Sequence, residues 1–216
     1  MNRFAIKASA AALALASAVL AHAESNIVTG AATSSPGAVA RVDFTIVIPK
    51  ILFLRVGAGS AYWPANSTLA NDPTVNLITF QPTAAQLGNG TAVAATAGSG
   101  DLTNGAVTAA VVSNSGNVTL VASAAGALNN GSTDTINWSE ITTTAATLNS
   151  GTALPAPTLT NTTSTSIVLT APATKVIKQD AKWTYAYANN SIPPAGTYGG
   201  TGGTNNGRIT YTATMP

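Results

Sequence analysis

The chain has 216 residues, of which only 7% are charged, and it contains 9 Lys and Arg, 7 Asp and Glu, one His and no Cys. The absence of Cys excludes a disulfide framework and, with a single His, leaves no ligand set for a zinc finger, a haem or a Cys–His nucleophile. The 33 Thr residues, with many Val and Ile, favour strands, and the Gly, Asn, Ser and Pro residues favour turns, so the composition predicts an all-β protein.

Residues 1–23 have the features of a secretory signal peptide. Arg3 and Lys7 give a positive start, residues 8–20 form an apolar run, and residues 21–23 (Ala-His-Ala) form a small-x-small cleavage site. The apolar run has 13 residues and is too short to span a bilayer as a helix. We therefore expect a bacterial protein that is exported through the periplasm to the cell surface or to an extracellular filament, with no membrane span once the signal is removed.

Cleavage after Ala23 would leave 193 residues with 7 basic and 7 acidic side chains and no histidine. A net charge of zero provides no electrostatic basis for nucleic-acid binding, and the loss of His22 excludes a Ser–His–Asp triad. The acids are scattered singly in turn-like contexts such as Asp72, next to Pro73, and do not form the carboxylate pair of a glycosidase. We therefore expect no enzyme, and we assign no catalytic, cofactor-binding or metal-ligating residue.

The N-terminal quarter of the mature chain is predicted to contain an arm and two strands. Residues 24–37 are small and polar and predict a flexible arm. Residues 39–48 alternate, with Val42, Phe44, Ile46 and Ile48 on one face, and predict a strand that ends at Pro49. Residues 51–56 are almost continuously apolar and predict a strand buried on both faces, followed by a loop over 57–72 and a short strand over 75–80.

The rest of the chain predicts further short strands and no amphipathic helix. Residues 106–123 predict a hairpin whose turn is 113–117, residues 136–138 and 167–169 predict short strands, and residues 148–165 predict a long connection. Trp183, Tyr185 and Tyr187 alternate with smaller or polar residues and predict a strand whose aromatic face belongs to the core, and residues 208–213 predict the final strand. Many short strands between Gly and Asn turns predict one antiparallel β-sandwich over residues 38–216.

The C-terminal segment carries a family resemblance. Residues 194–199 (Pro-Ala-Gly-Thr-Tyr-Gly) and 208–214 (Arg-Ile-Thr-Tyr-Thr-Ala-Thr) resemble the end of small bacterial fimbrial subunits of the spore-coat-protein-U and archaic chaperone–usher pilin group. The strand that ends at Pro49, with the second apolar strand and Gly57, is similar too, so the resemblance covers about the first and last quarters of the mature chain. The chain departs from that group in lacking a cysteine pair, in a Gly-rich insertion over 199–207 and in a long Ala- and Thr-rich middle.

The resemblance implies an immunoglobulin-like β-sandwich that lacks one strand, which the N-terminal arm of a neighbouring subunit replaces by β-augmentation. The donor would be residues 24–38, with Ile27, Thr29 and Ala31 or alternates such as Val28 facing inward; an ordinary unstructured N-terminus is the other interpretation. The implied function is an exported structural subunit of a fimbria or surface filament, with an adhesive role as a further implication. Its partners would be other copies or other fimbrial subunits, a periplasmic chaperone and an usher, with no cofactor.

Two loop aromatics support an alternative function. Tyr62 and Trp63 lie in the Gly- and Pro-containing segment 57–72, and exposed aromatic rings stack on sugars or on a protein partner. The alternative is a monomeric secreted module that binds carbohydrate or a surface through these two side chains.

Overall fold

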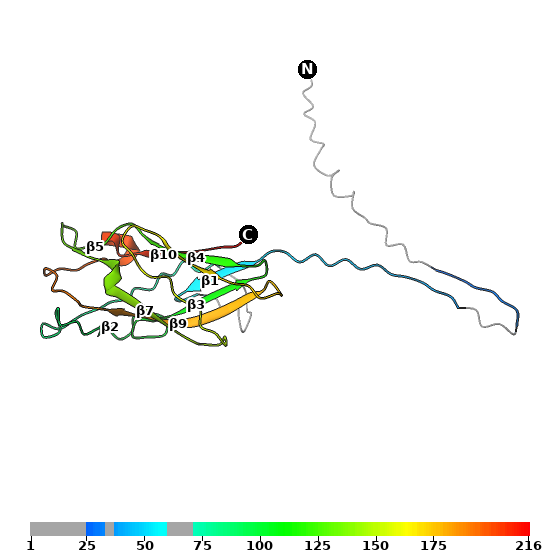
Figure 1. Ribbon diagram of the computed structural model, residues 1–216, viewed down its shortest axis with the longest axis horizontal. Coiled ribbons are helices and arrows are strands. Elements are labelled where there is room, and N and C mark those ends of the chain that lie inside the picture. The colour runs from blue at the N-terminus through cyan, green and yellow to red at the C-terminus, as the bar shows by residue number, and fades with distance from the viewer. Residues whose placement is uncertain (1–24, 33–36, 60–70) are drawn as a thin grey trace, which may run out of the picture. The chain divides into compact units, whose positions relative to one another are not determined.

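The computed structural model describes residues 25–32, 37–59 and 71–216, which divide into two units, Met1–Ile48 and Pro49–Pro216. Tyr62 and Trp63 lie outside the described residues. The Pro49–Pro216 unit is built from strands with two short 3-10 segments, η1 (Trp138–Glu140) and η2 (Thr201–Asn206), among its described residues (Figure 1). Its strands are β1 (Leu52–Val56), β2 (Val93–Ala94), β3 (Ala106–Ser113), β4 (Val118–Ala124), β5 (Leu128–Asn129), β6 (Thr135–Ile136), β7 (Ile141–Ala146), β8 (Thr165–Leu169), β9 (Ile177–Tyr187) and β10 (Ile209–Thr214).

Two antiparallel sheets pack together in this unit (Figure 1). In the first sheet β1 pairs with β3, β3 pairs with β9, and β2 and β7 also pair with β9. In the second sheet β4 lies between β10 and β8, and β5 and β6 form a separate two-stranded ladder. The prediction of an antiparallel all-β sandwich is therefore confirmed.

The segment over residues 106–123 connects the two sheets. Both strands predicted there are present, as β3 and β4, and residues 114–117 form the turn between them. The predicted hairpin is nevertheless wrong, because β3 pairs with β1 and β9 whereas β4 pairs with β8 and β10. Both strands carry enough apolar side chains to line a core, so the chain stacks them face to face across that core, and they do not pair edge to edge.

Aromatic side chains join the two sheets at the centre of the core, as predicted for Trp183, Tyr185 and Tyr187. Trp183 is fully buried; its Nε1–H donates to the Leu154 carbonyl at 2.7 Å, and its ring centroid lies 5.3 Å from that of Tyr211. The hydroxyls of Tyr185 on β9 and Tyr211 on β10 are 3.0 Å apart. Burial raises the pKa of Tyr185 well above its ordinary value and that of Tyr211 to about 12, so this hydroxyl pair stays uncharged at neutral pH.

A buried carboxylate on β9, that of Asp180, fixes the connection between β7 and β8 to this strand. Asp180 is 2% exposed, and its carboxylate accepts hydrogen bonds from the backbone and side-chain amides of Asn149 and from the backbone amide of Ser150, at 2.6–3.0 Å. The Ser150 hydroxyl also donates to the Asp180 carbonyl at 2.9 Å, and the Leu154 amide donates to the same oxygen at 3.0 Å. Burial acts to raise the pKa of Asp180, but the bonds from Asn149 and Ser150 outweigh it and hold the pKa below its ordinary value.

This carboxylate predicts a specific acid sensitivity. Because its folded-state pKa is depressed, Asp180 contributes stability that is complete above the ordinary Asp pKa of 3.8 and is lost as the pH falls through the lower folded-state pKa. We expect Asp180→Asn to reduce the free energy of unfolding at pH 7 and to make its acid dependence shallower than in the unsubstituted chain. Urea unfolding at several pH values from 7 to 2 measures both effects. Asp43→Asn, at an exposed position, is the control, and an unchanged acid dependence in Asp180→Asn would contradict the prediction.

Other sequence-based predictions differ from the structure in detail. No strand forms over residues 75–80, where Val75 is 66% exposed and only Phe80 makes an isolated bridge, to Ala95. The strand predicted over residues 136–138 is shorter, because Ile136 ends β6 and Trp138 begins η1. Strand β1 is an edge strand with half-buried side chains, and the prediction of burial on both faces is wrong. Within the described ranges, no helix has the length and apolar character needed to cross a membrane.

The Met1–Ile48 unit contains no helix and no strand ladder in its described residues, 25–32 and 37–48. The strand predicted over residues 39–48 therefore forms no ladder among the described residues, and the division between the two units falls between Ile48 and Pro49. The alternating apolar face of that segment is exposed to solvent: Val42 is 69% exposed, Phe44 88%, Ile46 84% and Ile48 74%. The pattern is typical of a strand, but no ladder includes this segment among the described residues.

Candidate functional site: the open edges of β1 and β10

Among the described strands, β1 and β10 each have a ladder partner on one edge only, and the two strands lie close to one another. Strand β1 pairs only with β3 and β10 pairs only with β4 among the described strands. Some Cα atoms of β1 and β10 come within 8 Å of each other, although no ladder joins the two strands. We call this place, formed by Leu52–Val56 and Ile209–Thr214, the seam. It is where an edge of the first sheet meets an edge of the second among the described strands.

The seam exposes part of the hydrophobic core. Alternate side chains of both strands are half-buried and pack on the core cluster; they are Leu52, Leu54 and Val56 from β1, and Ile209, Tyr211 and Ala213 from β10. The free edge of β7, by contrast, carries mostly exposed Thr and Ala. An unpaired edge beside apolar side chains is the combination that binds an added strand, because the edge supplies main-chain hydrogen bonds and the side chains supply pockets.

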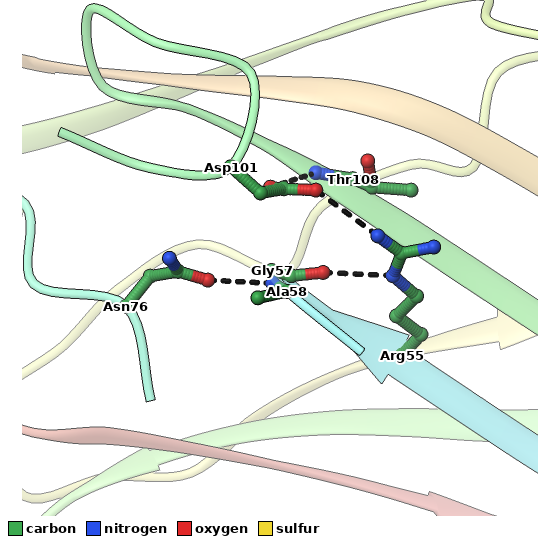
Figure 2. A network of polar contacts seen from close by, with 6 residues as sticks. All are labelled: Arg55, Gly57, Ala58, Asn76, Asp101 and Thr108. Carbon is green, nitrogen blue, oxygen red and sulfur yellow. Dashed lines mark hydrogen bonds and ion pairs between the residues drawn. The ribbon is translucent and has the colours of Figure 1, made fainter. Parts of the chain in front are cut away.

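A polar network holds the end of β1 in place (Figure 2). The Arg55 guanidinium donates from Nη2 to Asp101 Oδ2 at 3.1 Å and from Nε to the Gly57 carbonyl at 2.8 Å. The other oxygen of Asp101 accepts the Thr108 amide of β3 at 2.8 Å, and the Asn76 side chain accepts the Ala58 amide at 2.6 Å. Because the ion pair is largely shielded, with side chains 19% and 13% exposed, it fixes β1 against β3 and keeps the open edge in register.

Gly57 is required where β1 ends. Its φ is +93°, a region that disfavours any side chain, and a Cβ there would lie 2.2 Å from the Asn76 side-chain oxygen. Its amide donates to the Thr108 carbonyl at 2.7 Å. The glycine therefore lets the chain leave the sheet next to the network and limits β1 to five residues.

The start of β1 is held by a side chain that imitates a peptide group. Asn114 accepts the Ile51 amide at 2.9 Å through Oδ1 and donates to the Pro49 carbonyl at 2.8 Å through Nδ2. These two backbone groups lie on the same edge of the chain, as in an extended strand, so the β1–β3 pairing continues one step beyond Leu52. Lys50, between them, donates from Nζ to the Pro216 carbonyl at 3.0 Å. Residues 49–51 are thereby tied to the turn after β3 and to the end of the chain.

We expect Asn114→Ala to lower the free energy of unfolding by about 1–2 kcal/mol, because it removes two hydrogen bonds worth about 0.5–1.5 kcal/mol each. Hydrogen exchange should increase at the Ile51 amide and change little at the Trp183 amide in the centre of β9. Asn161→Ala is a matched control, since Asn161 also makes two side-chain hydrogen bonds but far from β1 along the chain. Unchanged exchange at Ile51 in Asn114→Ala would contradict the role assigned to Asn114.

The candidate residues from the sequence fall at different places. Ile27, Val28, Thr29 and Ala31 lie in the Met1–Ile48 unit, all four are exposed, and Ile27 is 88% exposed. Their part in assembly stays a prediction. Contact through Tyr62 and Trp63 also stays a prediction, because both lie outside the described residues. The described ranges contain no group of three His, Cys, Asp or Glu residues that could hold a metal ion.

The seam has no signature in the sequence. The strong alternation of residues 39–48 predicts a strand of the sandwich, yet one feature of the sequence argues otherwise. Only Pro49, Lys50 and Ile51 separate this segment from β1, and none of them is a Gly or Asn of the kind that reverses a chain in a hairpin. Two strand-like runs joined without a turn predict that the first run continues away from the second and pairs elsewhere.

Comparison with protein-family models, with curated proteins and with solved structures found no match to this chain.

Proposed function

We propose that the chain is an exported structural subunit of a bacterial fimbria or surface filament, in which residues 39–48 of one copy add as a strand to the seam of the next. The observation that carries this proposal is the pair of complementary features described above. Residues 39–48 have a strand pattern but belong to no ladder among the described residues, and each seam strand has a described neighbour on one edge only, beside half-buried apolar side chains. The donor proposed here lies C-terminal to the residue 24–38 arm that the family resemblance implies.

The energetics favour such pairing. Val42, Phe44, Ile46 and Ile48 are each at least 69% exposed, and burying a side chain of this kind contributes about 1.5–3 kcal/mol. The opposite face carries Arg41, Asp43 and Thr45 together with Val39 and Val47, and it would remain in solvent after strand addition. The face proposed for pairing is thus apolar and the other face is mixed, a division that suits the edge of a sandwich.

The spacing of β1 and β10 determines how a strand can be added. Neighbouring strands lie about 4.8 Å apart, so a strand that pairs with both β1 and β10 needs about 9.6 Å between them. Some Cα atoms of β1 lie within 8 Å of Cα atoms of β10, so the insertion of a strand between β1 and β10 has to move these two strands apart. Pairing with one edge alone needs no such movement and is the expected first step of assembly.

A second copy is proposed as the acceptor because pairing between copies leaves the hydrogen bonds of Asn114 to Pro49 and Ile51 in place.

The finer parts of the proposal come from the family resemblance. They are an immunoglobulin-like strand order with one strand missing, delivery by a periplasmic chaperone and an usher, and an adhesive role at the bacterial surface. The Ala-Gly-Thr-Tyr turn over residues 195–198 and the alternating strand β10 support them, since they are the segments that carry the resemblance.

Multi-angle light scattering and electron microscopy of the exported full-length chain test the proposal. We expect multimers whose mass rises with concentration and whose images are linear. A synthetic peptide of residues 39–48 in excess should cap the seam and reduce the mean mass, whereas a scrambled peptide of the same composition should not. Strictly monomeric chains at all concentrations, with no binding of the peptide, would count against the proposal.

A further inference from the structure

We infer that a pocket at the outer face of the second sheet binds a sugar acid through Arg208. The pocket has a volume of about 410 Å³ and is bounded by the end of β4, the start of β10 and the η2 segment. Its lining residues are Ser123, Ala124, Ala125, Gly203, Asn206, Arg208 and Thr210. Arg208 is the only charged residue among them.

The guanidinium of Arg208 is available for a ligand. It forms no ion pair and no hydrogen bond with any residue in the described parts of the chain, in contrast to Arg55, whose charge is matched by Asp101. Gly203 lies alongside the Arg208 stem, since a Cβ on Gly203 would come within 3.6 Å of the Arg208 Cβ. The side chain thus rests against η2 at the rim of the pocket. An unmatched guanidinium beside a concave surface favours a planar anion, above all a carboxylate bound by two parallel N–H donors.

Neutral polar groups surround this charge. Ser123 and Thr210 are cross-strand partners, and the Ser123 hydroxyl donates to the Thr210 carbonyl at 3.4 Å. Asn206 donates from Nδ2 to the Ala127 carbonyl at 3.0 Å, which fixes its side chain and leaves Oδ1 as an acceptor. Two hydroxyls and an amide oxygen provide both donors and acceptors, which is what the hydroxyls of a sugar require.

These groups together define the ligand class. A carboxylate alone would use Arg208 and leave the hydroxyls and the amide to water, and a neutral sugar would leave the guanidinium unmatched. A monosaccharide that carries a carboxylate, such as a uronic acid, uses both parts. Ala124, Ala125 and Gly203 form a lining with small side chains that admits a pyranose ring.

The site does not require strand addition, although Thr210 belongs to both the pocket and the seam. Ser123, Arg208 and Thr210 alternate with the side chains that pack on the core, because Ile209 and Tyr211 are the β10 residues directed to it. The pocket therefore faces away from the core, and a monomer is sufficient for binding. A negative result for sugar-acid binding would not contradict the proposed strand addition, and a negative result for strand addition would not contradict sugar-acid binding.

Nuclear magnetic resonance titration of the full chain tests the inference, with galacturonate, galactose, acetate and sulfate as probes. We expect galacturonate to shift the Thr210 amide and the Arg208 Nε signals and to bind at least tenfold more tightly than galactose or acetate. Arg208→Gln should abolish the preference for galacturonate over galactose, and Arg208→Lys, which keeps the charge without the planar fork, should reduce it. Lys178→Gln removes the same charge at an exposed position on β9 and should leave binding unchanged.

Four results would overturn the inference. Equal affinity for galacturonate and galactose, or unchanged binding in Arg208→Gln, would show that Arg208 is not the anchor. Acetate or sulfate binding as tight as galacturonate would show a general anion site with no sugar specificity. No shift with any probe would show that the pocket binds none of them. The thermal unfolding midpoint of each variant verifies that the exposed substitutions leave the fold intact.

Discussion

Replacing Phe44 and Ile46 together by Asp should abolish self-association of the chain and leave the stability of the Pro49–Pro216 unit unchanged. Both side chains are more than 80% exposed in the isolated chain, so their loss removes no packing from the sandwich. In the proposed assembly both become buried, and each introduced carboxylate would then lie uncompensated among apolar side chains, at a cost of several kcal/mol. Light scattering should therefore give the mass of a monomer at concentrations where the unsubstituted chain forms multimers.

The control places the same charges on the opposite face of the same segment. Thr45 and Val47 alternate with Phe44 and Ile46, and Val47 is 86% exposed. Thr45→Asp with Val47→Asp adds two carboxylates to the face that remains in solvent, so association should persist, weakened only by general repulsion. Equal loss of association in both double variants would show that charge, not the apolar face, controls assembly, and the strand-addition model would then be wrong.

Trp183→Ala should lower the free energy of unfolding by about 3–5 kcal/mol, the usual range for removing a large aromatic side chain from a core. Trp183 is fully buried on the central strand β9, contacts the ring of Tyr211 on the facing sheet and donates its indole N–H to the Leu154 carbonyl. Its loss affects both sheets and the connection before β8 at once. Since domains are stable by only about 5–15 kcal/mol, this substitution removes a large part of the total. Urea unfolding followed by circular dichroism measures the change.

Two further variants separate the contributions at this position. Trp183→Phe keeps most of the apolar volume but leaves the Leu154 carbonyl without its donor, so an intermediate loss is expected. Val168→Ala removes apolar groups from a side chain on β8 that is 60% exposed, and it should change stability by less than about 0.5 kcal/mol. A loss in Trp183→Ala no larger than that in Val168→Ala would contradict the position of Trp183 at the centre of the core.

Side-chain periodicity located two of the strands. Trp183, Tyr185 and Tyr187 alternate along the second half of β9 and are all buried, and the same two-residue period located β10. Strands β3 and β4 start where they were predicted, at Ala106 and Val118, whereas β2, β5 and β7 were not predicted. A two-residue period is a local property of an extended chain with one buried face. It can therefore be read from a single sequence.

Side-chain alternation does not predict which strands pair with one another. The Ser-Asn-Ser-Gly-Asn turn between β3 and β4 has the composition of a hairpin turn, yet it joins two different sheets, because alternation does not distinguish edge-to-edge from face-to-face neighbours. The same limit explains the misplacement of residues 39–48, whose pattern is that of a strand whether its partner is within the chain or outside it. The Arg55–Asp101 ion pair and the Asn114 hydrogen bonds join residues 46 or more positions apart and have no local signature.

The turn between β3 and β4 has a consequence for the order in which the protein folds. Because β3 and β4 do not pair with each other, β4 can pair only after β8 or β10 has been made. Strand β3 can pair with β1 at once, but its other partner, β9, lies some seventy residues later in the chain. Native contacts are thus mostly between distant parts of the chain, which slows folding to about milliseconds to seconds. In the export proposed above, a chain emerging from a translocation channel would hold both sheets incomplete until its last forty residues had passed. Such delayed closure would keep the chain unfolded in the channel and would leave its apolar strands in need of protection at the exit.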